Sequence, residues 1–414
     1  MSANYSLPKE RIKVLLLEGV AETAADAFDA AGYRSVERLT TALDAEELKE
    51  KLDGVRLLGI RSRTKITDEI VRSAPRLIAV GCFSVGTNQV DLRAACAAGV
   101  PVFNAPFSNT RSVAELTIAE IVMLYRGVFP KSVAAHQGRW MKTAQGSHEV
   151  RGKTLGIVGY GNIGSQLAML AEAMGMRVIF HDHTDKLQHG RVLPAGDLKA
   201  LLAQSDVVSL HLPETDATKN MFGEAEIRAM KPGAFLINNA RGSLVDLEEL
   251  ATALRDGRLA GAAVDVFPVE PGSNSDELQT PLRGLDNVIL TPHVGGSTYE
   301  AQQQIGSEVA RKLIDYSDIG STFGAVNFPQ VQLPVTDNVT RFLQVQRNLP
   351  GELQRLNEIF ARRAVNITGQ HYRTDGEVGY VVLDAEGQVP DSEELVEEIR
   401  ALPGTIRARR LHSA

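Results

Sequence analysis

Short runs of apolar residues recur along most of this chain, and no other feature restricts its fold as strongly. Runs of three or four residues without polar alternation are typical of strands that are buried on both faces, as in a parallel sheet covered by helices. In the first hundred residues such runs occupy positions 14–17, 57–60 and 77–80, and amphipathic stretches follow them. This alternation predicts an α/β domain.

A second α/β block begins at Lys153 and has six runs of the same kind, at residues 155–158, 178–180, 207–210, 235–237, 262–264 and 288–290. Six strands at this spacing describe a doubly wound sheet of the dinucleotide-binding type. A long helix predicted over residues 111–126 precedes the block, and another over 298–314 returns the chain to the first domain. We therefore predict a discontinuous, flavodoxin-like first domain of residues 1–107 and 299–332 around a Rossmann domain of residues 108–298.

The chain from residue 338 to residue 414 follows a different pattern. Its apolar positions predict the order strand, helix, strand, strand, helix, strand, which is the βαββαβ order of a ferredoxin-like fold. Asp375-Gly376 is a hairpin turn signal between the two middle strands. We predict a third, separate domain after a linker that contains Pro334 and Asp337.

The charge balance excludes one large class of function. Lysine and arginine total 44 and aspartate and glutamate 51, so the net charge of −7 lacks the basic excess that a nucleic-acid partner requires. No apolar run approaches the roughly 20 residues that span a bilayer, and residues 1–10 lack the apolar core of a secretory signal. We expect a cytoplasmic protein without nucleic-acid or membrane partners. Cys82 and Cys96 have no metal-ligand spacing, so we expect reduced thiols and no metal.

A glycine-rich motif at the start of the second block predicts a dinucleotide site. Gly159, Gly161 and Gly164 allow a tight turn, the approach of a pyrophosphate to a helix N-terminus and close packing of helix on strand. Asp182 ends the next apolar run, where a carboxylate accepts hydrogen bonds from a ribose diol and repels a 2′-phosphate. The cofactor is therefore predicted to be NAD rather than NADP, although flanking histidines and a lysine offer cations that would offset part of this repulsion.

Three polar residues follow later runs of this block, at the strand ends where ligands bind in open α/β sheets. Taken singly, Arg241, Glu270 and His293 have ordinary explanations, such as a surface ion pair, a loop residue or a hydrogen-bonded polar group. Together, beside a dinucleotide, they supply what hydride transfer at a 2-hydroxy acid requires. An imidazole takes the hydroxyl proton, a carboxylate orients the imidazole, and a guanidinium binds the substrate carboxylate and polarises the C2 oxygen.

With these residues the chain resembles the D-isomer-specific 2-hydroxyacid dehydrogenases, whose arginine, glutamate and histidine match Arg241, Glu270 and His293. Longer segments narrow the resemblance to the bacterial and fungal members that oxidise D-3-phosphoglycerate to 3-phosphohydroxypyruvate, the first step toward L-serine. These segments are residues 58–64, 81–91, 104–115 and 291–298. In such members 2-oxoglutarate is often reduced as well. The resemblance further implies substrate contacts by Ser84, Gly86, Asn109 and Arg111, and NAD contacts by Asn162, Ile163, Asn239, Ala240, Asp265 and Gly296.

Two arginines of the first block suit a phosphorylated substrate. Arg61 and Arg63 end a predicted strand and alternate across Ser62, so we expect both side chains on one side of that strand. Two guanidinium groups directed into a cleft between domains would bind a phosphate dianion. The alternative is that they pair with carboxylates of the first domain.

The C-terminal domain resembles an ACT regulatory domain, a module that pairs through sheet edges and holds an amino acid at the dimer interface. Asn348 and Asn366 match polar contacts of that module, whereas Gln346 stands where serine-inhibited relatives have a histidine. Inhibition by L-serine and a purely structural dimerisation role both stay open.

The resemblance also implies a homotetramer built from contacts of the nucleotide-binding and ACT domains. Trp140, the only tryptophan, is predicted either to anchor an interface between subunits or to lie in the core. Two other functions remain, a dehydrogenase for another D-2-hydroxy acid and an NAD-sensing corepressor with the same three site residues. Arg61, Arg63 and the ACT-like domain argue against the corepressor.

Overall fold

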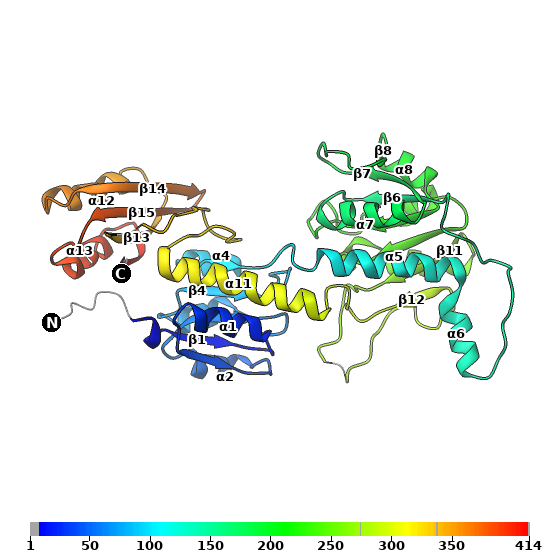
Figure 1. Cartoon of the computed structure of the whole chain (residues 1–414), viewed down its shortest axis with the longest axis horizontal. Coiled ribbons are helices and arrows are strands. Elements are labelled where there is room, and N and C mark those ends of the chain that lie inside the picture. Colours follow the sequence, from blue (N-terminus) through cyan, green and yellow to red (C-terminus); the bar gives the residue numbers. More distant parts are fainter. Residues whose placement is uncertain (1–7, 274, 337, 413–414) are drawn as a thin grey trace. The chain divides into compact units, whose positions relative to one another are not determined.

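The computed structural model describes residues 8–273, 275–336 and 338–412, and the chain divides into two compact units (Figure 1). One unit contains the chain up to Ser108 and from Gln302 onward, and the other contains Asn109–Ala301. The first unit carries two sheets and the second carries one. Residues 1–7, on which the argument against a secretory signal mainly rests, and Asp337 of the linker lie outside the described residues.

The first sheet is parallel and has the order β2-β1-β3-β4-β5, the flavodoxin-like order. Its strands are β1 (Lys13–Leu16), β2 (Ser35–Arg38), β3 (Val55–Ile60), β4 (Ala79–Cys82) and β5 (Val102–Phe103). The helices around it are η1 (Lys9–Arg11), α1 (Glu22–Ala30), α2 (Ala45–Lys51), α3 (Asp68–Ser73), α4 (Leu92–Ala97) and most of α11 (Tyr299–Ile319). The apolar runs predicted β1 and β3 and placed β4 two residues too early. They missed β2, whose residues are at most half-buried, and β5, which has only two residues.

The sheet of the second unit is also parallel, in the order β12-β11-β10-β9-β6-β7-β8. Its strands are β6 (Thr154–Val158), β7 (Arg177–His181), β8 (Leu193–Pro194), β9 (Val207–Leu210), β10 (Ala234–Asn238), β11 (Leu259–Val264) and β12 (Val288–Leu290). Its helices are α5 (Thr110–Arg126), α6 (Val128–His136), α7 (Asn162–Ala173), α8 (Leu198–Gln204), α9 (Glu224–Ala229), η2 (Gly242–Leu244) and α10 (Leu247–Arg255). The six predicted strands are present, and the seventh, β8, is a two-residue edge strand with exposed side chains and no apolar run.

The last part of the chain has the predicted βαββαβ order and forms an antiparallel sheet, β14-β15-β13-β16. Its elements are β13 (Val339–Arg347), α12 (Glu352–Arg362), β14 (Ile367–Asp375), β15 (Val378–Glu386), α13 (Ser392–Arg400) and β16 (Thr405–His412). The predicted hairpin between β14 and β15 is present, but its two turn residues are Gly376 and Glu377, because Asp375 still pairs with Val378 as the last residue of β14.

One face of this antiparallel sheet packs against the first domain. Tyr380 of β15 belongs to the same buried cluster as Tyr316 of α11, and its hydroxyl donates to the carbonyl of Gly320 at 2.6 Å. Beside it, Arg341 and Asp384 form a buried ion pair with an Nε–Oδ1 distance of 2.6 Å. Arg341 also donates to the backbone carbonyl at the end of α11. The ACT-like sheet and the first domain therefore share one core.

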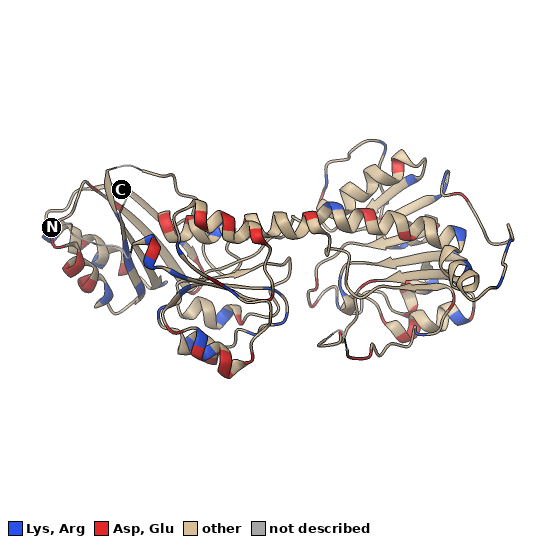
Figure 2. Cartoon of the chain, turned by 60° about the horizontal axis from the view of Figure 1, so that its bottom comes forward, with Lys and Arg blue, Asp and Glu red and all other residues tan. Residues whose placement is uncertain are grey.

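Acidic and basic residues are mixed along the helices of both units (Figure 2). Within residues 8–273, 275–336 and 338–412, no helix is both long and apolar enough to cross a membrane. Cys82 and Cys96 are both free, and burial raises the pKa of the Cys82 thiol to about 12.

Candidate active site

The three predicted catalytic residues follow three neighbouring strands of the second unit. Arg241 comes shortly after β10, Glu270 lies in the loop after β11, and His293 lies in the loop after β12. Because these strands are adjacent and parallel, their carboxyl ends meet at one edge of the sheet. The fold thus brings together residues that are far apart in the sequence.

His293 and Glu270 form a hydrogen-bonded pair. Nδ1 of His293 lies 2.9 Å and 3.0 Å from the two carboxylate oxygens of Glu270. A carboxylate only accepts, so Nδ1 carries the proton, and Nε2 keeps a lone pair that can take a proton from a substrate. The hydrogen bond to Glu270 raises the pKa of His293 and outweighs the effect of burial. Burial disfavours the charge of Glu270, but the hydrogen bond from His293 and its charge outweigh this and lower the pKa of Glu270.

Asp265 holds the loop that carries His293. Its buried carboxylate accepts a hydrogen bond from the Thr291 hydroxyl at 2.6 Å and from the N–H groups of Val294 and Gly295, both at 2.8 Å. Its backbone carbonyl accepts from the N–H of His293 at 2.8 Å. These bonds maintain His293 at a φ of +54°, a left-handed conformation that costs roughly 1–3 kcal/mol for a residue with a Cβ. The family resemblance assigns Asp265 to the cofactor, and no local feature of the sequence predicts this second role.

Arg241 reaches the same edge of the sheet. Its Nη1 donates to the carbonyl of Ala240 at 2.7 Å, and its charge helps to lower the pKa of Glu270. The next residue is Gly242, where a Cβ would collide with the backbone of Phe267. The missing side chain therefore lets the loop of Glu270 lie directly against the turn of Arg241.

The glycine-rich turn has the shape of a dinucleotide cradle. β6 leads into Gly159, and α7 begins at Asn162. A Cβ on Gly164 would collide with the carbonyl of Gly159, so α7 can approach the strand only because residue 164 is glycine. No atom lies near the place that a Cβ on residue 161 would occupy, which leaves space at the helix N-terminus for a pyrophosphate. These residues fit NAD.

Asp182 follows β7 as predicted, and its side chain is only 7% exposed. One of its oxygens accepts from the N–H of Tyr160 at 2.9 Å and the other from the N–H of Thr184 at 3.1 Å. Burial disfavours its charge, but the hydrogen bonds from Thr184 and Tyr160 outweigh this and lower the pKa of Asp182. Its ionised carboxylate suits a ribose diol. Two of the flanking residues predicted to offset its charge, His183 and Lys186, have nitrogen atoms 3.3 Å and 3.8 Å from the carboxylate.

Asn239, which the family resemblance assigns to NAD, is bound to α5. Its buried amide donates to Oγ1 of Thr117 at 3.0 Å and to a carboxylate oxygen of Glu120 at 2.6 Å. Glu120 is fully buried, and this burial raises its pKa to about 7, with the charge of Asp265 contributing. Glu120 was not among the predicted site residues, although its helical spacing from Thr117 places it on the buried stripe of α5.

The remaining residues assigned to NAD lie at the carboxyl ends of the same strands: Asn162 and Ile163 in the first turn of α7, Ala240 after β10, and Gly296 in the loop after β12. Asn109, assigned to the substrate, precedes α5 and packs so closely on Gly296 that a Cβ there would lie 2.5 Å from its amide nitrogen. Arg111 is largely exposed and pairs with Glu115 one turn later on α5, with an N–O distance of 2.5 Å.

Arg61 and Arg63 lie after β3, which ends at Ile60, so the prediction that they end a strand is wrong. The buried carboxylate of Glu18 accepts hydrogen bonds from the N–H groups of Arg61 (3.2 Å), Arg63 (3.0 Å) and Thr64 (2.9 Å), and these bonds curve the chain into a loop. The strand alternation therefore does not determine where the two side chains point. Within the described ranges, neither guanidinium has an ion pair or hydrogen bond with a carboxylate, so the alternative pairing is not observed.

The other two substrate residues predicted in the first unit are close to this loop. Ser84 follows β4, the neighbour of β3, and its hydroxyl donates to the carbonyl of Gly86 at 2.8 Å. Gln89 connects the two segments, since its amide donates to the carbonyl of Arg61 and to the hydroxyl of Ser84. The first unit thus brings its four predicted substrate residues to the carboxyl ends of β3 and β4.

The three predicted regulatory residues do not meet within one chain. Gln346 is fully buried on β13, and neither of its amide atoms has a hydrogen-bond partner among the described residues. Asn348 donates to the carbonyl of Gly376, just before β15, whereas Asn366 donates to Glu386, the last residue of β15. Asn348 and Asn366 therefore lie at opposite ends of the sheet.

Comparison with known proteins agrees with this geometry. Residues 118–295 match the family described as D-isomer specific 2-hydroxyacid dehydrogenase, NAD binding domain, and residues 342–407 match the AHAS small subunit-like ACT domain. The chain is 53% identical over 412 residues to D-3-phosphoglycerate dehydrogenase of Haemophilus influenzae and 44% identical over 412 residues to that of Dictyostelium discoideum, with all of each chain covered. A structure of D-lactate dehydrogenase from Aquifex aeolicus with NAD and lactic acid is 29% identical, with a TM-score of 0.65 over 74% of this chain and 95% of that one.

The fold, the cradle and the three residues at the strand ends define an NAD-dependent dehydrogenase of 2-hydroxy acids. The match to its relatives runs through the ACT domain to the end of the chain. The chain belongs to the D-3-phosphoglycerate dehydrogenases, within the D-isomer-specific 2-hydroxyacid dehydrogenase family. The family, the cofactor and the reaction class predicted from the motifs are confirmed.

Proposed function

We propose that this enzyme oxidises D-3-phosphoglycerate to 3-phosphohydroxypyruvate with NAD, the first step toward L-serine. The observation that carries the proposal is the His293–Glu270 pair, which leaves Nε2 of His293 free at the edge of the sheet that holds Arg241 and the cofactor cradle. The full-length relatives that carry the name of this activity support the choice of substrate.

His293 acts as the base in this reaction. Its Nε2 takes the proton of the C2 hydroxyl, and the carboxylate of Glu270 stabilises the positive charge that forms on the ring. The hydride that leaves C2 needs an acceptor, which NAD would supply when bound in the cradle. Arg241 binds the substrate carboxylate and polarises the C2 oxygen. In the reverse direction, protonated His293 returns its proton to the carbonyl oxygen of the substrate.

Arg61 and Arg63 supply the phosphate site in this proposal. Glu18 binds the backbone of their loop, so it shapes the loop through N–H groups and leaves both guanidinium groups for a ligand. A guanidinium binds phosphate oxygens through paired N–H donors, which suits a dianion.

The decisive experiment compares NADH formation from D-3-phosphoglycerate and from D-glycerate, which differ only in the phosphate. Charge-assisted hydrogen bonds contribute about 1.5–3 kcal/mol each, so kcat/KM should favour the phosphorylated acid by about 100-fold or more. Equal values would reject the phosphate site and favour a dehydrogenase for another 2-hydroxy acid. NAD binding without turnover of either acid would favour the NAD-sensing function.

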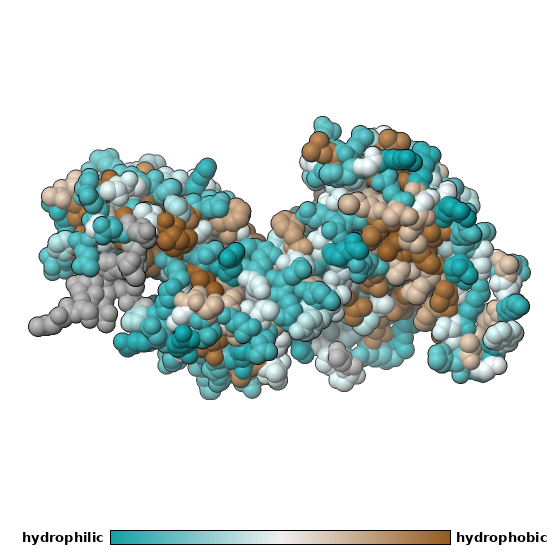
Figure 3. Space-filling view, in the orientation of Figure 1, coloured by the Kyte–Doolittle hydropathy of each residue, from teal (hydrophilic) through white to brown (hydrophobic). Residues whose placement is uncertain are grey.

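A homotetramer is the assembly that we propose. Trp140 is 86% exposed in the single chain, which excludes the alternative of a core residue. A hydrophobic area extends over α5 and the start of α6 (Figure 3), where Val128, Phe129 and Val133 are exposed. Exposed apolar side chains in one area are typical of a protein interface, and a second copy of this domain is the partner that we propose.

Inhibition by L-serine is also a proposal. The opposite positions of Asn348 and Asn366 support a site completed by two chains, because a two-fold axis would bring one end of each sheet beside the other end of its partner. A direct test is titration of NADH formation with L-serine. Reduction of 2-oxoglutarate and a cytoplasmic location stay predictions.

A further inference from the structure

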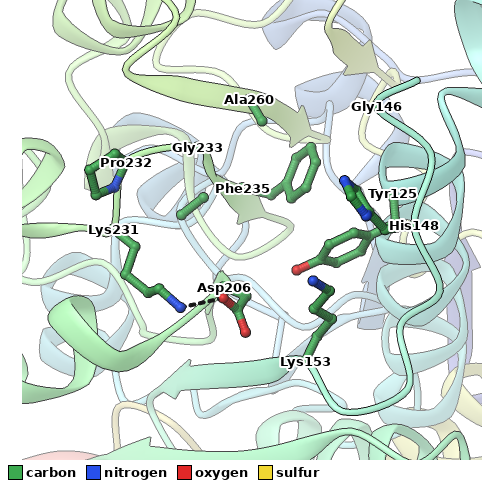
Figure 4. A pocket seen from close by; sticks show the side chains of 11 residues that line it. Tyr125, Gly146, His148, Lys153, Asp206, Lys231, Pro232, Gly233, Phe235 and Ala260 are labelled. Carbon is green, nitrogen blue, oxygen red and sulfur yellow. Dashed lines mark hydrogen bonds and ion pairs between the residues drawn. The ribbon is translucent and has the colours of Figure 1, made fainter.

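A cavity of about 210 Å³ lies in the second unit (Figure 4). It lies at the opposite edge of the sheet from the active site. Its lining includes Lys153 before β6, Asp206 before β9 and Phe235 of β10, at the amino ends of these strands. Tyr125 of α5 and His148 of the segment after α6 also belong to the lining. One water molecule fills about 30 Å³, whereas drug-sized ligands need roughly 300 Å³ or more, so the cavity suits a small molecule.

The hydroxyl of Tyr125 faces this cavity without a partner. Tyr125 is only 3% exposed, and its ring packs edge-on against the ring of Phe235, with 4.8 Å between the ring centroids. Its hydroxyl oxygen has no hydrogen bond with any described residue. Burial, with a contribution from the charge of Asp206, raises the pKa of Tyr125, so the hydroxyl keeps its proton and stays a donor. A buried donor without an acceptor costs about 1–3 kcal/mol, which an acceptor in the cavity would recover.

The charges around the cavity leave one cation free. Asp206 uses one oxygen for Lys231, at 2.5 Å, and the other for the N–H of Thr154, at 2.8 Å. Lys153 helps to lower the pKa of Asp206, but its side-chain ammonium group has no hydrogen bond or ion pair with any described residue. In Figure 4 the Lys153 amine and the Tyr125 hydroxyl are directed toward the same part of the cavity. The carboxylate of Asp206 thus faces the ammonium groups of Lys231 and Lys153. The one without a partner, that of Lys153, lies on the side of the Tyr125 hydroxyl.

We propose that this cavity binds a small oxyanion, the phosphate or carboxylate group of a small molecule, between the Lys153 amine and the Tyr125 hydroxyl. The imidazole of His148 offers a ring N–H as a third donor, and the Phe235 ring forms an apolar wall. The anion would join α5 to the segment after α6 that carries Trp140. The site lies apart from Arg241, Glu270 and His293, which stand at the carboxyl ends of the strands.

Lysine footprinting on the full-length enzyme tests this site separately from the active site. Trace acetylation, read by mass spectrometry, gives the labelling rate of Lys153 and of Lys199, an exposed lysine of the same unit. Inorganic phosphate and acetate are each titrated against sodium chloride at equal ionic strength, which distinguishes phosphate from carboxylate. Bound anion should slow the labelling of Lys153 by the factor 1 + [L]/Kd, about twofold at the dissociation constant, and leave Lys199 unchanged.

The matched variants are Tyr125→Phe, which keeps the ring and removes the hydroxyl, and Tyr299→Phe, which removes an exposed hydroxyl elsewhere. Protection of Lys153 in Tyr125→Phe should need at least about tenfold more anion, whereas Tyr299→Phe should match the wild type. Equal protection of Lys153 and Lys199, no protection by either anion, or unchanged protection in Tyr125→Phe would each overturn the proposal. The proposal would also be overturned if Lys153 is protected from labelling without any anion and becomes reactive when the enzyme is diluted. That result would show that a second copy of the chain covers the cavity.

Discussion

Replacing Glu120 by glutamine should change how the stability of this enzyme depends on pH. Burial raises the pKa of Glu120 from its ordinary value of 4.5 to about 7. Between these values the unfolded chain loses the proton first, so the free energy of unfolding falls as the pH rises and levels off above pH 7. One pKa unit corresponds to about 1.4 kcal/mol, which gives a loss of about 2–3 kcal/mol between pH 5 and pH 8. Glutamine keeps the oxygen that accepts from Asn239 but does not titrate.

Urea unfolding of the full chain, followed by circular dichroism at pH 5, 6.5 and 8, measures this change. The difference between wild type and Glu120→Gln isolates the single carboxyl, because other titrating groups cancel. Between pH 5 and pH 8, the free energy of unfolding of the variant should rise by about 2–3 kcal/mol relative to that of the wild type. Glu115→Gln, on the exposed face of the same helix, is the control and should show no such trend. The reasoning would be refuted if the free energy of unfolding depended on pH in the same way in the wild type and in Glu120→Gln.

Three further predictions concern activity and assembly. Arg63→Ala should lower kcat/KM for D-3-phosphoglycerate by about 10- to 100-fold and leave D-glycerate nearly unchanged in initial-rate assays, whereas equal losses would remove Arg63 from the phosphate site. The rate of oxidation should rise and the rate of reduction should fall as the pH rises through the pKa of His293. Because Glu270 raises that pKa, Glu270→Gln should move both pH–rate limbs to lower pH. Limbs that do not move would show that Glu270 does not control the proton transfer by His293. Trp140→Ala should weaken subunit association by about 2 kcal/mol or more in sedimentation experiments, and an unchanged assembly would place the interface elsewhere.

The strands were predictable where burial on both faces leaves a run of apolar residues. β1, β3 and the central strands of the second unit carry such runs, because helices cover both faces of their sheets. β2 and β8 lie at the edges of their sheets with partly or fully exposed residues, so neither burial nor periodicity marks them. The order of the strands followed from the family resemblance and the rules for doubly wound folds rather than from any local signal.

The site residues also fall into those that the sequence predicts and those that it does not. Arg241, Glu270 and His293 were predictable because each follows a strand, and the ends of parallel strands meet. The buried acids were not. Glu18 binds a loop more than forty residues away, and Asp265 binds the loop after β12. Such contacts depend on tertiary packing and leave no periodic trace in the sequence, which is also why the shape of the loop of Arg61 was predicted wrongly.

The core shared by the C-terminal sheet and the first domain has a consequence for how this enzyme can change. Deleting the last domain would uncover Tyr316 and leave the carbonyl of Gly320 without the Tyr380 hydroxyl, so a shortened chain would lose part of its own interior. A variant that lacks this domain would therefore test the stability of the first domain as much as any role of the C-terminal sheet. Single substitutions on the sheet face that points away from Tyr316 leave this shared interior in place.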